Sequence, residues 1–171
     1  MKDTRIHRRA AQGLTLPEAL LATAVLAFAV IAVTQAIVAA QTQAEDALVQ
    51  QRAMSLAEAM LEEILSLSYA DPEDIDVAGP DTGETTRQLF DNMDDYHGYS
   101  EAVGALTDIT ATAYPDTYQR FARSVTASFG SVNVAALGGN TDGLTVTVTI
   151  TDTPGRTWTL SRFVPEPAED D

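Results

Sequence analysis

The sequence contains no cysteine, one lysine and only two histidines. Without cysteine the chain has neither a disulfide framework nor a thiolate for catalysis or metal binding. His7 and His97 each stand alone, so no histidine pair is present for zinc binding or for acid–base chemistry. A phosphate-binding glycine loop is also missing, because LGGN at 137–140 is typical of a turn between strands. We therefore expect that the protein is not an enzyme.

Positive charge is scarce and unevenly placed. The 171 residues include 25 acidic and 10 basic side chains, which gives a formal net charge of -15. Residues 1–13 form a basic leader with a net charge of +3, whereas the remainder carries -18. Such an acidic chain repels phosphate backbones, so we expect no nucleic-acid partner. The length suits one modest domain with an additional segment.

Charge is absent from the 22 residues between Ala19 and Ala40. As a helix this run would extend about 33 Å, close to the roughly 30 Å hydrocarbon thickness of a bilayer. We predict that residues 14–40 form the membrane-spanning half of a long helix. The basic leader before the span predicts a cytoplasmic N-terminus. A cleaved secretory signal peptide is the alternative, although its apolar region is usually shorter, about 7–15 residues.

The helix is expected to continue beyond the membrane, because residues 41–69 contain neither proline nor glycine. This half is amphipathic: its apolar residues recur at helical spacing. They are Leu56, Met60, Ile64 and Leu67, with Leu61 and Leu65 widening the stripe. We predict one helix from about Leu16 to Ser68, which the dipeptide Asp71-Pro72 ends.

The rest of the chain predicts loops followed by strands. Residues 70–116 are rich in Asp, Gly and Pro and should form an acidic, variable loop region at the surface. Residues 117–164 should form an antiparallel sheet, since LTVTVTIT alternates and DTPG makes a hairpin turn. Residues 165–171 are too polar to pack and should be a disordered acidic tail. The expected fold class is α+β, with one long N-terminal helix packed on a small antiparallel sheet.

The acidic loop contains weak candidates for calcium ligands. Asp91, Asp94 and Asp95 lie within the sequence DNMDD, and further acids stand between Asp71 and Asp76. Calcium needs six to eight oxygen ligands, and neither group has the spacing of an EF-hand. A solvated acidic surface is the favoured interpretation. We therefore expect no cofactor or metal, with calcium as the one candidate.

Glu18, in the sequence GLTLPEAL, places a carboxylate at the edge of the apolar run. In one interpretation Thr15 caps the helix and Glu18 completes a Thr-x-x-Glu capping box. That interpretation explains local geometry only. A charge in the apolar layer costs about 2.5–3.5 kcal/mol, so an intramembrane carboxylate usually has a partner.

The basic leader ending in Gly13, the sequence LTLPEAL and the apolar helix after it resemble the prepilin-type signal of type IV pilins and type II secretion pseudopilins. Leu14 and Pro17 replace the residues most common there. The resemblance implies that a prepilin peptidase cuts between Gly13 and Leu14 and methylates the new amino group. It also implies that Glu18 pairs with an N-terminal amine within a growing filament, and that the fold is pilin-like.

Two further segments, AMSLAEAMLEEILSL and FDNMDDYHGYSE, resemble parts of minor pilins and minor pseudopilins. The resemblance implies a non-enzymatic structural subunit of a type IV pilus or a type II secretion pseudopilus. Its expected place is the bacterial inner membrane, as a single-pass protein with a periplasmic C-terminal domain. Its expected partners are the prepilin peptidase, other pilin or pseudopilin subunits and the inner-membrane assembly platform. The alternative is a signal-anchored extracytoplasmic binding module unrelated to filaments.

Overall fold

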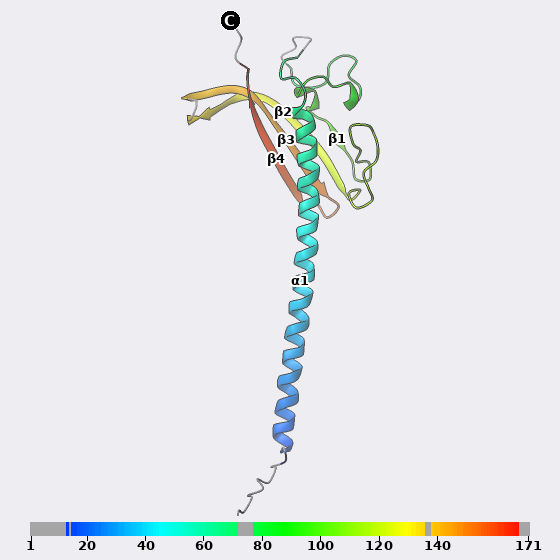
Figure 1. The fold of residues 1–171 in the computed structure, drawn as a ribbon, viewed down its shortest axis with the longest axis vertical. Coiled ribbons are helices and arrows are strands. Elements are labelled where there is room, and N and C mark those ends of the chain that lie inside the picture. Colours follow the sequence, from blue (N-terminus) through cyan, green and yellow to red (C-terminus); the bar gives the residue numbers. More distant parts are fainter. Residues whose placement is uncertain (1–12, 14, 72–76, 136–137, 168–171) are drawn as a thin grey trace, which may run out of the picture. The chain divides into compact units, whose positions relative to one another are not determined.

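The computed structural model describes residues 13, 15–71, 77–135 and 138–167. Helix α1 (Leu16–Leu65) comes first and is followed by the short 3-10 helices η1 (Arg87–Leu89) and η2 (Asp94–Tyr96). The strands are β1 (Ser100–Glu101), β2 (Phe121–Val134), β3 (Gly139–Asp152) and β4 (Thr157–Pro165) (Figure 1). The predicted α+β class is confirmed: a 50-residue helix packs on a four-stranded antiparallel sheet. The chain divides into two compact units, Met1–Asp46 and Ala47–Asp171.

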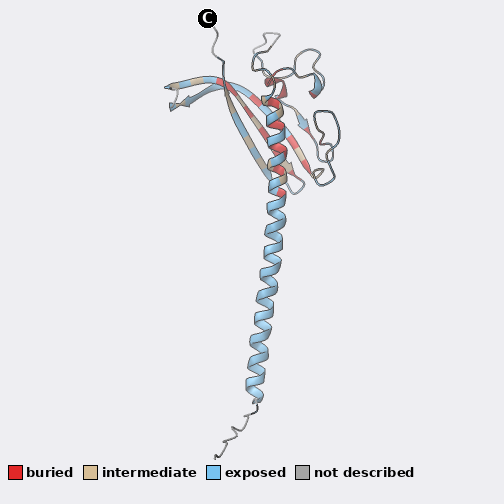
Figure 2. Cartoon of the chain, viewed as in Figure 1, coloured by how far each residue is buried: buried red, intermediate tan, exposed pale blue. Residues whose placement is uncertain are grey.

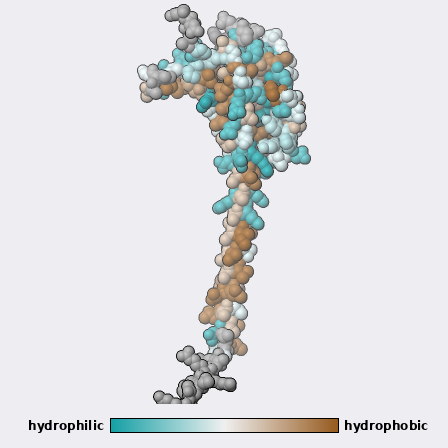
Figure 3. All heavy atoms as spheres, in the orientation of Figure 1, coloured by the Kyte–Doolittle hydropathy of each residue, from teal (hydrophilic) through white to brown (hydrophobic). Residues whose placement is uncertain are grey.

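In the first unit, helix α1 is long and apolar enough to cross a membrane. Its large apolar side chains are exposed, and Figure 3 shows them as a hydrophobic surface along the helix. The Thr23 hydroxyl donates a hydrogen bond to the Leu20 carbonyl, and the Thr34 hydroxyl donates one to the Val30 carbonyl, each with a donor–acceptor distance of 2.9 Å. These hydroxyls are thus satisfied within the helix, as a hydrocarbon environment requires.

In the second unit the strands lie in the order β1-β2-β3-β4. Strands β2 and β3 pair over their whole length, from Phe121 opposite Asp152 to Val134 opposite Gly139. Strands β3 and β4 pair as the predicted hairpin, whose turn follows Asp152. The Asp152 carboxylate accepts hydrogen bonds from the Arg156 amide and Nε, both at 2.9 Å. The Asp152 side chain therefore stabilises the turn that the sequence DTPG predicts.

The core lies between one face of the sheet and the C-terminal half of α1 (Figure 2). The alternation of LTVTVTIT is confirmed, since Leu144, Val146, Val148 and Ile150 are all buried. Helix α1 contributes Val49, Ala53, Leu56, Ala57, Met60, Leu61 and Ile64. The predicted stripe is therefore confirmed for Leu56, Met60, Leu61 and Ile64, whose burial supplies about 1.5–3 kcal/mol each. Leu65 and Leu67 are half-buried against the core, and Leu67 lies beyond the end of the helix.

Helix α1 ends at Leu65, so the predicted end near Ser68 is wrong by about one turn. The Ser66 hydroxyl donates a hydrogen bond to the Glu63 carbonyl at 2.6 Å. The Leu67 amide bonds the carbonyl of Ile64, three residues earlier, in a turn that is tighter than an α-helical turn. The Ser68 carbonyl then accepts the Met93 amide at 3.0 Å. The Ser66 hydroxyl thus competes for a carbonyl of the last helical turn, and the Ser68 carbonyl bonds outside the helix, so the chain leaves the helix before the Asp-Pro pair.

The described part of the predicted loop region contributes to the core, which corrects the expectation that it lies at the surface. Its buried side chains are Arg87, Asn92, Met93, Asp94, Asp95, Tyr96, Glu101 and Leu106. Tyr96 and Leu106 bring apolar surface, and the polar members bond to one another or to backbone. These buried residues stand singly along an irregular backbone and do not recur at a regular spacing. Hydrophobic periodicity in the sequence therefore cannot detect them.

Candidate functional site

The prepilin-type segment lies at the beginning of α1. The Thr15 carbonyl accepts the Ala19 amide at 3.0 Å, which is the first hydrogen bond of the helix. Glu18 is exposed in the first turn, where the helix dipole favours a negative charge. Gly13 is exposed as well, whereas Leu14 lies outside the described residues. Cleavage, methylation, the capping box and pairing of Glu18 with an amine stay predictions.

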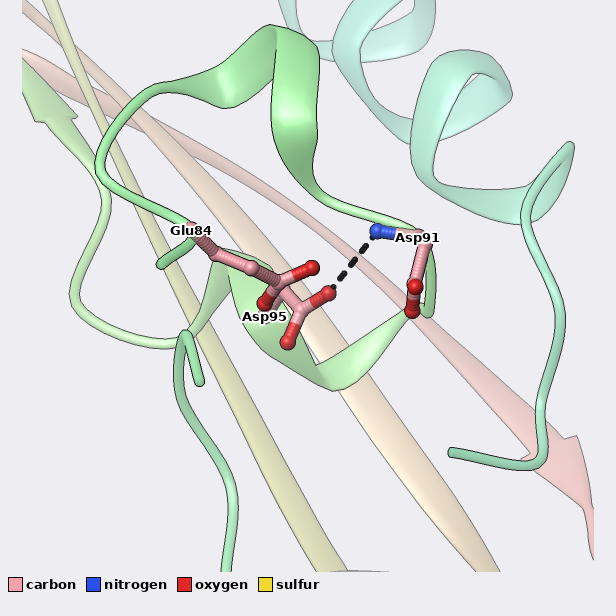
Figure 4. A group of neighbouring side chains, drawn as sticks. All are labelled: Glu84, Asp91 and Asp95. Carbon is pink, nitrogen blue, oxygen red and sulfur yellow. Dashed lines mark hydrogen bonds between the residues drawn. The ribbon is translucent and has the colours of Figure 1, made fainter. Parts of the chain in front are cut away.

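The acidic loop brings together a different set of carboxylates from the one expected. Side-chain oxygens of Glu84, Asp91 and Asp95 lie within 4.8 Å of one another (Figure 4). Two of the weak calcium candidates, Asp91 and Asp95, belong to this group. The third, Asp94, does not, and Glu84 takes its place. Residues 72–76, which hold most of the other acids considered, lie outside the described part of the chain.

Backbone amides orient the carboxylates of this cluster. Asp95 Oδ2 accepts the amides of Asp91 and Asn92 at 3.0 and 3.1 Å. In return, Asn92 Oδ1 accepts the amides of Asp94 and Asp95 at 2.9 and 3.1 Å. Glu84 accepts the amide of Asp81 at 3.0 Å. These reciprocal side-chain turns explain why a run rich in Asp and Asn folds compactly here.

The cluster is electrostatically unfavourable for ionised carboxyl groups. Burial raises the pKa of Glu84, and the neighbouring Asp95 adds to that shift. Burial also raises the pKa of Asp95, although hydrogen bonds from the Asn92 and Asp91 amides and with the Glu84 carboxyl act in the opposite direction. Burial also raises the pKa of Asp94. The ion pairs found among the described residues involve Glu63, Glu101 and Asp152 as acids, and none of them includes a member of the cluster.

A buried ion-pair network, which sequence reasoning missed, lies beside the core. Arg87 Nε donates to Glu63 Oε1 at 2.5 Å, and Arg87 Nη2 bonds the other oxygen. Arg123 Nε donates to Glu101 Oε2 at 2.8 Å, and Arg87 Nη1 lies 3.8 Å from Glu101 Oε1. Arg87 Nη1 also donates to the Thr107 carbonyl at 2.9 Å. The network joins α1, η1, β1 and β2.

The charges within this network support one another. Although burial opposes the ionised forms, Glu63 raises the pKa of Arg87 and Arg123 lowers the pKa of Glu101. Buried ion pairs of this kind fix geometry more than they add net stability. A sequence signal was present for Arg123 only, because it falls between Phe121 and Val125 on the buried side of β2.

His97, the lone histidine of the described region, is exposed, and its Nδ1 lies 2.6 Å from the Ala127 carbonyl oxygen. This contact ties η2 to β2. Whether the protein is an enzyme stays untested.

Comparison with family models, with curated proteins and with solved structures returned no match. The architecture itself is consistent with a pilin-like fold, because a long apolar N-terminal helix packs against an antiparallel four-stranded sheet.

Proposed function

We propose that this chain is a non-enzymatic structural subunit, a minor pilin or minor pseudopilin, that a prepilin peptidase processes and an inner-membrane platform assembles. The observation that carries the proposal is the position of the Gly13–Glu18 segment immediately before and within the first turn of α1. That helix offers an exposed apolar half for a membrane and for neighbouring subunits, and a second half that packs on a sheet.

Gly13 supports the proposal because the fold itself does not require glycine there. A Cβ added at this position would meet no atom within 4 Å, and Gly13 is not among the glycines with positive φ. Glycine is therefore not explained by packing or by backbone strain. Recognition by a processing peptidase explains both the residue and its place next to the apolar helix.

Glu18 supports the proposal through its chemistry. An exposed carboxylate at the entry to an apolar helix costs energy in lipid unless a cation approaches it. A free N-terminal amine created at Leu14 would be such a cation, supplied within a filament. An amine and a carboxylate in a low-dielectric environment attract strongly, and this attraction can set the register between subunits.

Processing distinguishes this function from a signal-anchored binding module. Mass spectrometry of the protein from its own host should find an N-terminal methylated Leu14. Gly13→Val should leave the leader attached, whereas Thr15→Ser, which keeps the hydroxyl, should still be processed. An intact Met1 terminus in the wild-type protein, or cleavage near Ala40, would contradict the proposal.

The proposed location follows from the same features. The protein would sit in the bacterial inner membrane with a cytoplasmic leader and a periplasmic second unit, and would enter a type IV pilus or a type II secretion pseudopilus after processing. The net charge of -18 beyond residue 13 favours arginine-bearing protein partners over nucleic acid. Binding to such partners should weaken as salt rises.

A further inference from the structure

We propose that the open edge of strand β2, at Phe129, Ser131 and Asn133, pairs with the same edge of a second copy of this chain, so that two sheets become one. This inference does not depend on the proposed function and uses the backbone of β2, not the apolar half of α1. It rests on the backbone groups that the sheet leaves unpaired, on the lack of charge in this segment and on the fit of its side chains.

Strands β2 and β3 extend beyond the rest of the sheet as a two-stranded arm, formed by residues 129–134 and 139–142 (Figure 1). Strand β1 pairs with β2 well before the arm begins. On the other side, the pairing of β3 with β4 starts only at Gly143, opposite Pro165. Among the described residues, no third strand pairs with β2 along the arm.

The outer edge of β2 is covered up to the start of the arm. The Val125 amide donates a hydrogen bond to the Tyr99 carbonyl at 2.9 Å, on the β1 side of the strand. Two residues further along, His97 Nδ1 lies 2.6 Å from the Ala127 carbonyl oxygen and 3.3 Å from the Ala127 nitrogen. The imidazole therefore takes the place of a strand partner at Ala127.

Beyond Ala127 the same edge is open. Every second residue of an antiparallel strand directs its amide and carbonyl to the same side, so Phe129, Ser131 and Asn133 continue this edge. All three residues are exposed, and the described residues supply no hydrogen bond to their outward backbone groups. Such a row of alternating donors and acceptors is ready to pair with another strand.

The charge of the segment favours a second copy of the chain as the partner. Residues 124–141 form the longest uncharged run outside the apolar half of α1, although the chain carries -18 beyond residue 13. Edge strands are usually protected by charges, by proline or by a bulge. This run contains neither charge nor proline, and β2 and β3 pair along it without a bulge. Two acidic chains can therefore bring these edges together without contact between like charges.

The nearest acid on the arm is also far enough from its own copy. Asp142 lies opposite Ser131 in the register of β2 and β3. Neighbouring strands lie about 4.8 Å apart, so three strand spacings, roughly 14 Å, would separate the two Asp142 residues of a joined sheet. This distance exceeds the screening length of about 8 Å at physiological ionic strength, so their repulsion is weak.

An antiparallel pair with its two-fold axis at Ser131 satisfies every outward group. Ser131 would face its own copy, and Phe129 would face Asn133 of the second copy on either side, each pair exchanging two hydrogen bonds. Between these pairs, Val132 of one chain would meet Gly130 of the other. Val132 is 40% exposed, and a Cβ added at Gly130 would meet nothing within 4 Å, so the valine side chain has room above the glycine.

The test uses the absence of cysteine, because an introduced thiol is then the only one in the chain. Ser131→Cys would place two thiols opposite each other at the axis, where Cα atoms lie about 5.5 Å apart. Disulfides span Cα distances of about 4.4–6.8 Å. Mild oxidation of the full chain in detergent micelles should therefore give a disulfide-linked dimer on a non-reducing gel. The micelles are kept in large excess over the protein, so that two apolar helices rarely share one.

Asn133→Cys is the matched control on the same edge. In the proposed register the two copies of residue 133 are offset by four positions, roughly 14 Å along the strands, which is too far for a disulfide. This variant should form at least about tenfold less dimer than Ser131→Cys under the same oxidation.

A second pair of variants tests the backbone bonds. In the Ser131→Cys background, Asn133→Pro removes an outward amide that β3 does not use, which an edge strand tolerates. Because two hydrogen bonds are lost across the axis, cross-linking should fall at least about tenfold. Asn133→Ala in the same background should cross-link as before. Both replacements remove the side-chain bond to Asn140, so they differ in the backbone donor.

The outcomes separate the alternatives. A dimer of Ser131→Cys that Asn133→Pro weakens and Asn133→Ala does not supports the proposal. No dimer of Ser131→Cys would overturn it, and would leave the edge to an extended segment of another protein. Equal cross-linking of Ser131→Cys and Asn133→Cys would also overturn it, because the contact would then be an unspecific collision without a register.

Discussion

Arg87 and Glu63 form a bidentate ion pair that joins the loop after helix α1 to the helix itself. The arginine side chain is 4% exposed and the glutamate side chain 17%. Tyr96 adds a hydrogen bond to the same glutamate at 2.5 Å. A single carboxylate on the helix therefore organises two separate parts of the loop.

Arg87→Ala should destabilise the second unit by about 3–5 kcal/mol, because it leaves the half-buried Glu63 without its cation, whereas Glu101 keeps Arg123. Urea denaturation of the full chain in micelles measures this loss. The matched control is Arg162→Ala, an exposed arginine on β4, which should change stability by no more than about 0.5 kcal/mol. Equal free energies of unfolding for the two variants would show that the ion pair of Arg87 does not stabilise the second unit.

The second unit should fold without the apolar half of α1. A fragment of residues 41–171 keeps every helix residue of the core, from Val49 to Ile64. We expect it to be soluble and to unfold cooperatively. A fragment of residues 71–171 lacks this cover for the buried face of β3 and should not fold. The packing would be refuted if both fragments melted cooperatively at one temperature.

The sequence predicted the parts of this fold that repeat. The buried residues of α1 recur three or four positions apart and those of β3 recur at every second position, so both periods are visible without a structure. The end of α1 was missed because Ser66 and Ser68 act on single backbone groups. The Glu63–Arg87 pair was missed because the two residues are far apart in sequence, and no local pattern relates them.

The same contrast applies to the candidate sites. Asp91 and Asp95 were visible as neighbours in DNMDD, but the loop turns Asp94 out of the group and brings Glu84 into it. Which acids converge depends on the Asn92 and Asp95 turns, which are tertiary details. Gly13 and Glu18 were visible for the opposite reason: the signal proposed for them is one contiguous stretch of sequence, so it can be recognised without the tertiary fold.

Gly143 on β3 should not tolerate a side chain. A Cβ there would lie 2.2 Å from the Val164 carbonyl oxygen and 2.8 Å from the Phe163 ring. Gly143→Ala must therefore push β4 away and should cost about 1–3 kcal/mol. Gly130, its partner on β2, is the control, because a Cβ there meets nothing within 4 Å. Thermal unfolding should show a lower Tm for Gly143→Ala alone, and an equal effect of both changes would contradict this packing.

Asp152 should make stability depend on acidity. Although burial opposes it, the bonds from Arg156 lower the pKa of this carboxyl below its ordinary value of 3.8. A depressed pKa gives stability that is present above pH 3.8 and is lost as pH falls through the folded-state value. Asp152→Asn should therefore cost about 1 kcal/mol at pH 7, a modest figure because Arg120 and Arg156 are 39% and 41% exposed.

The difference between the wild-type protein and Asp152→Asn should shrink on acidification and disappear when the carboxyl is protonated in both states. Denaturation at a series of pH values measures it. The control is Asp142→Asn, an exposed acid on the same strand, which should show no such convergence. A constant difference at all pH values would assign the effect to turn geometry instead of charge.

Glu18→Gln separates the two interpretations of this residue. Glutamine also serves in a capping box, so the helix should still begin at the same place. The charge is removed, however, and the variant should be cleaved and inserted normally but should enter filaments, or cross-link to partner subunits, at least about tenfold less, the effect of roughly 1.4 kcal/mol. Glu58→Gln changes an exposed glutamate in the other half of α1 and should assemble as the wild type does. Normal incorporation of Glu18→Gln would leave this carboxylate with the capping role alone, because a subunit register set by an ion pair cannot survive the loss of one of its charges.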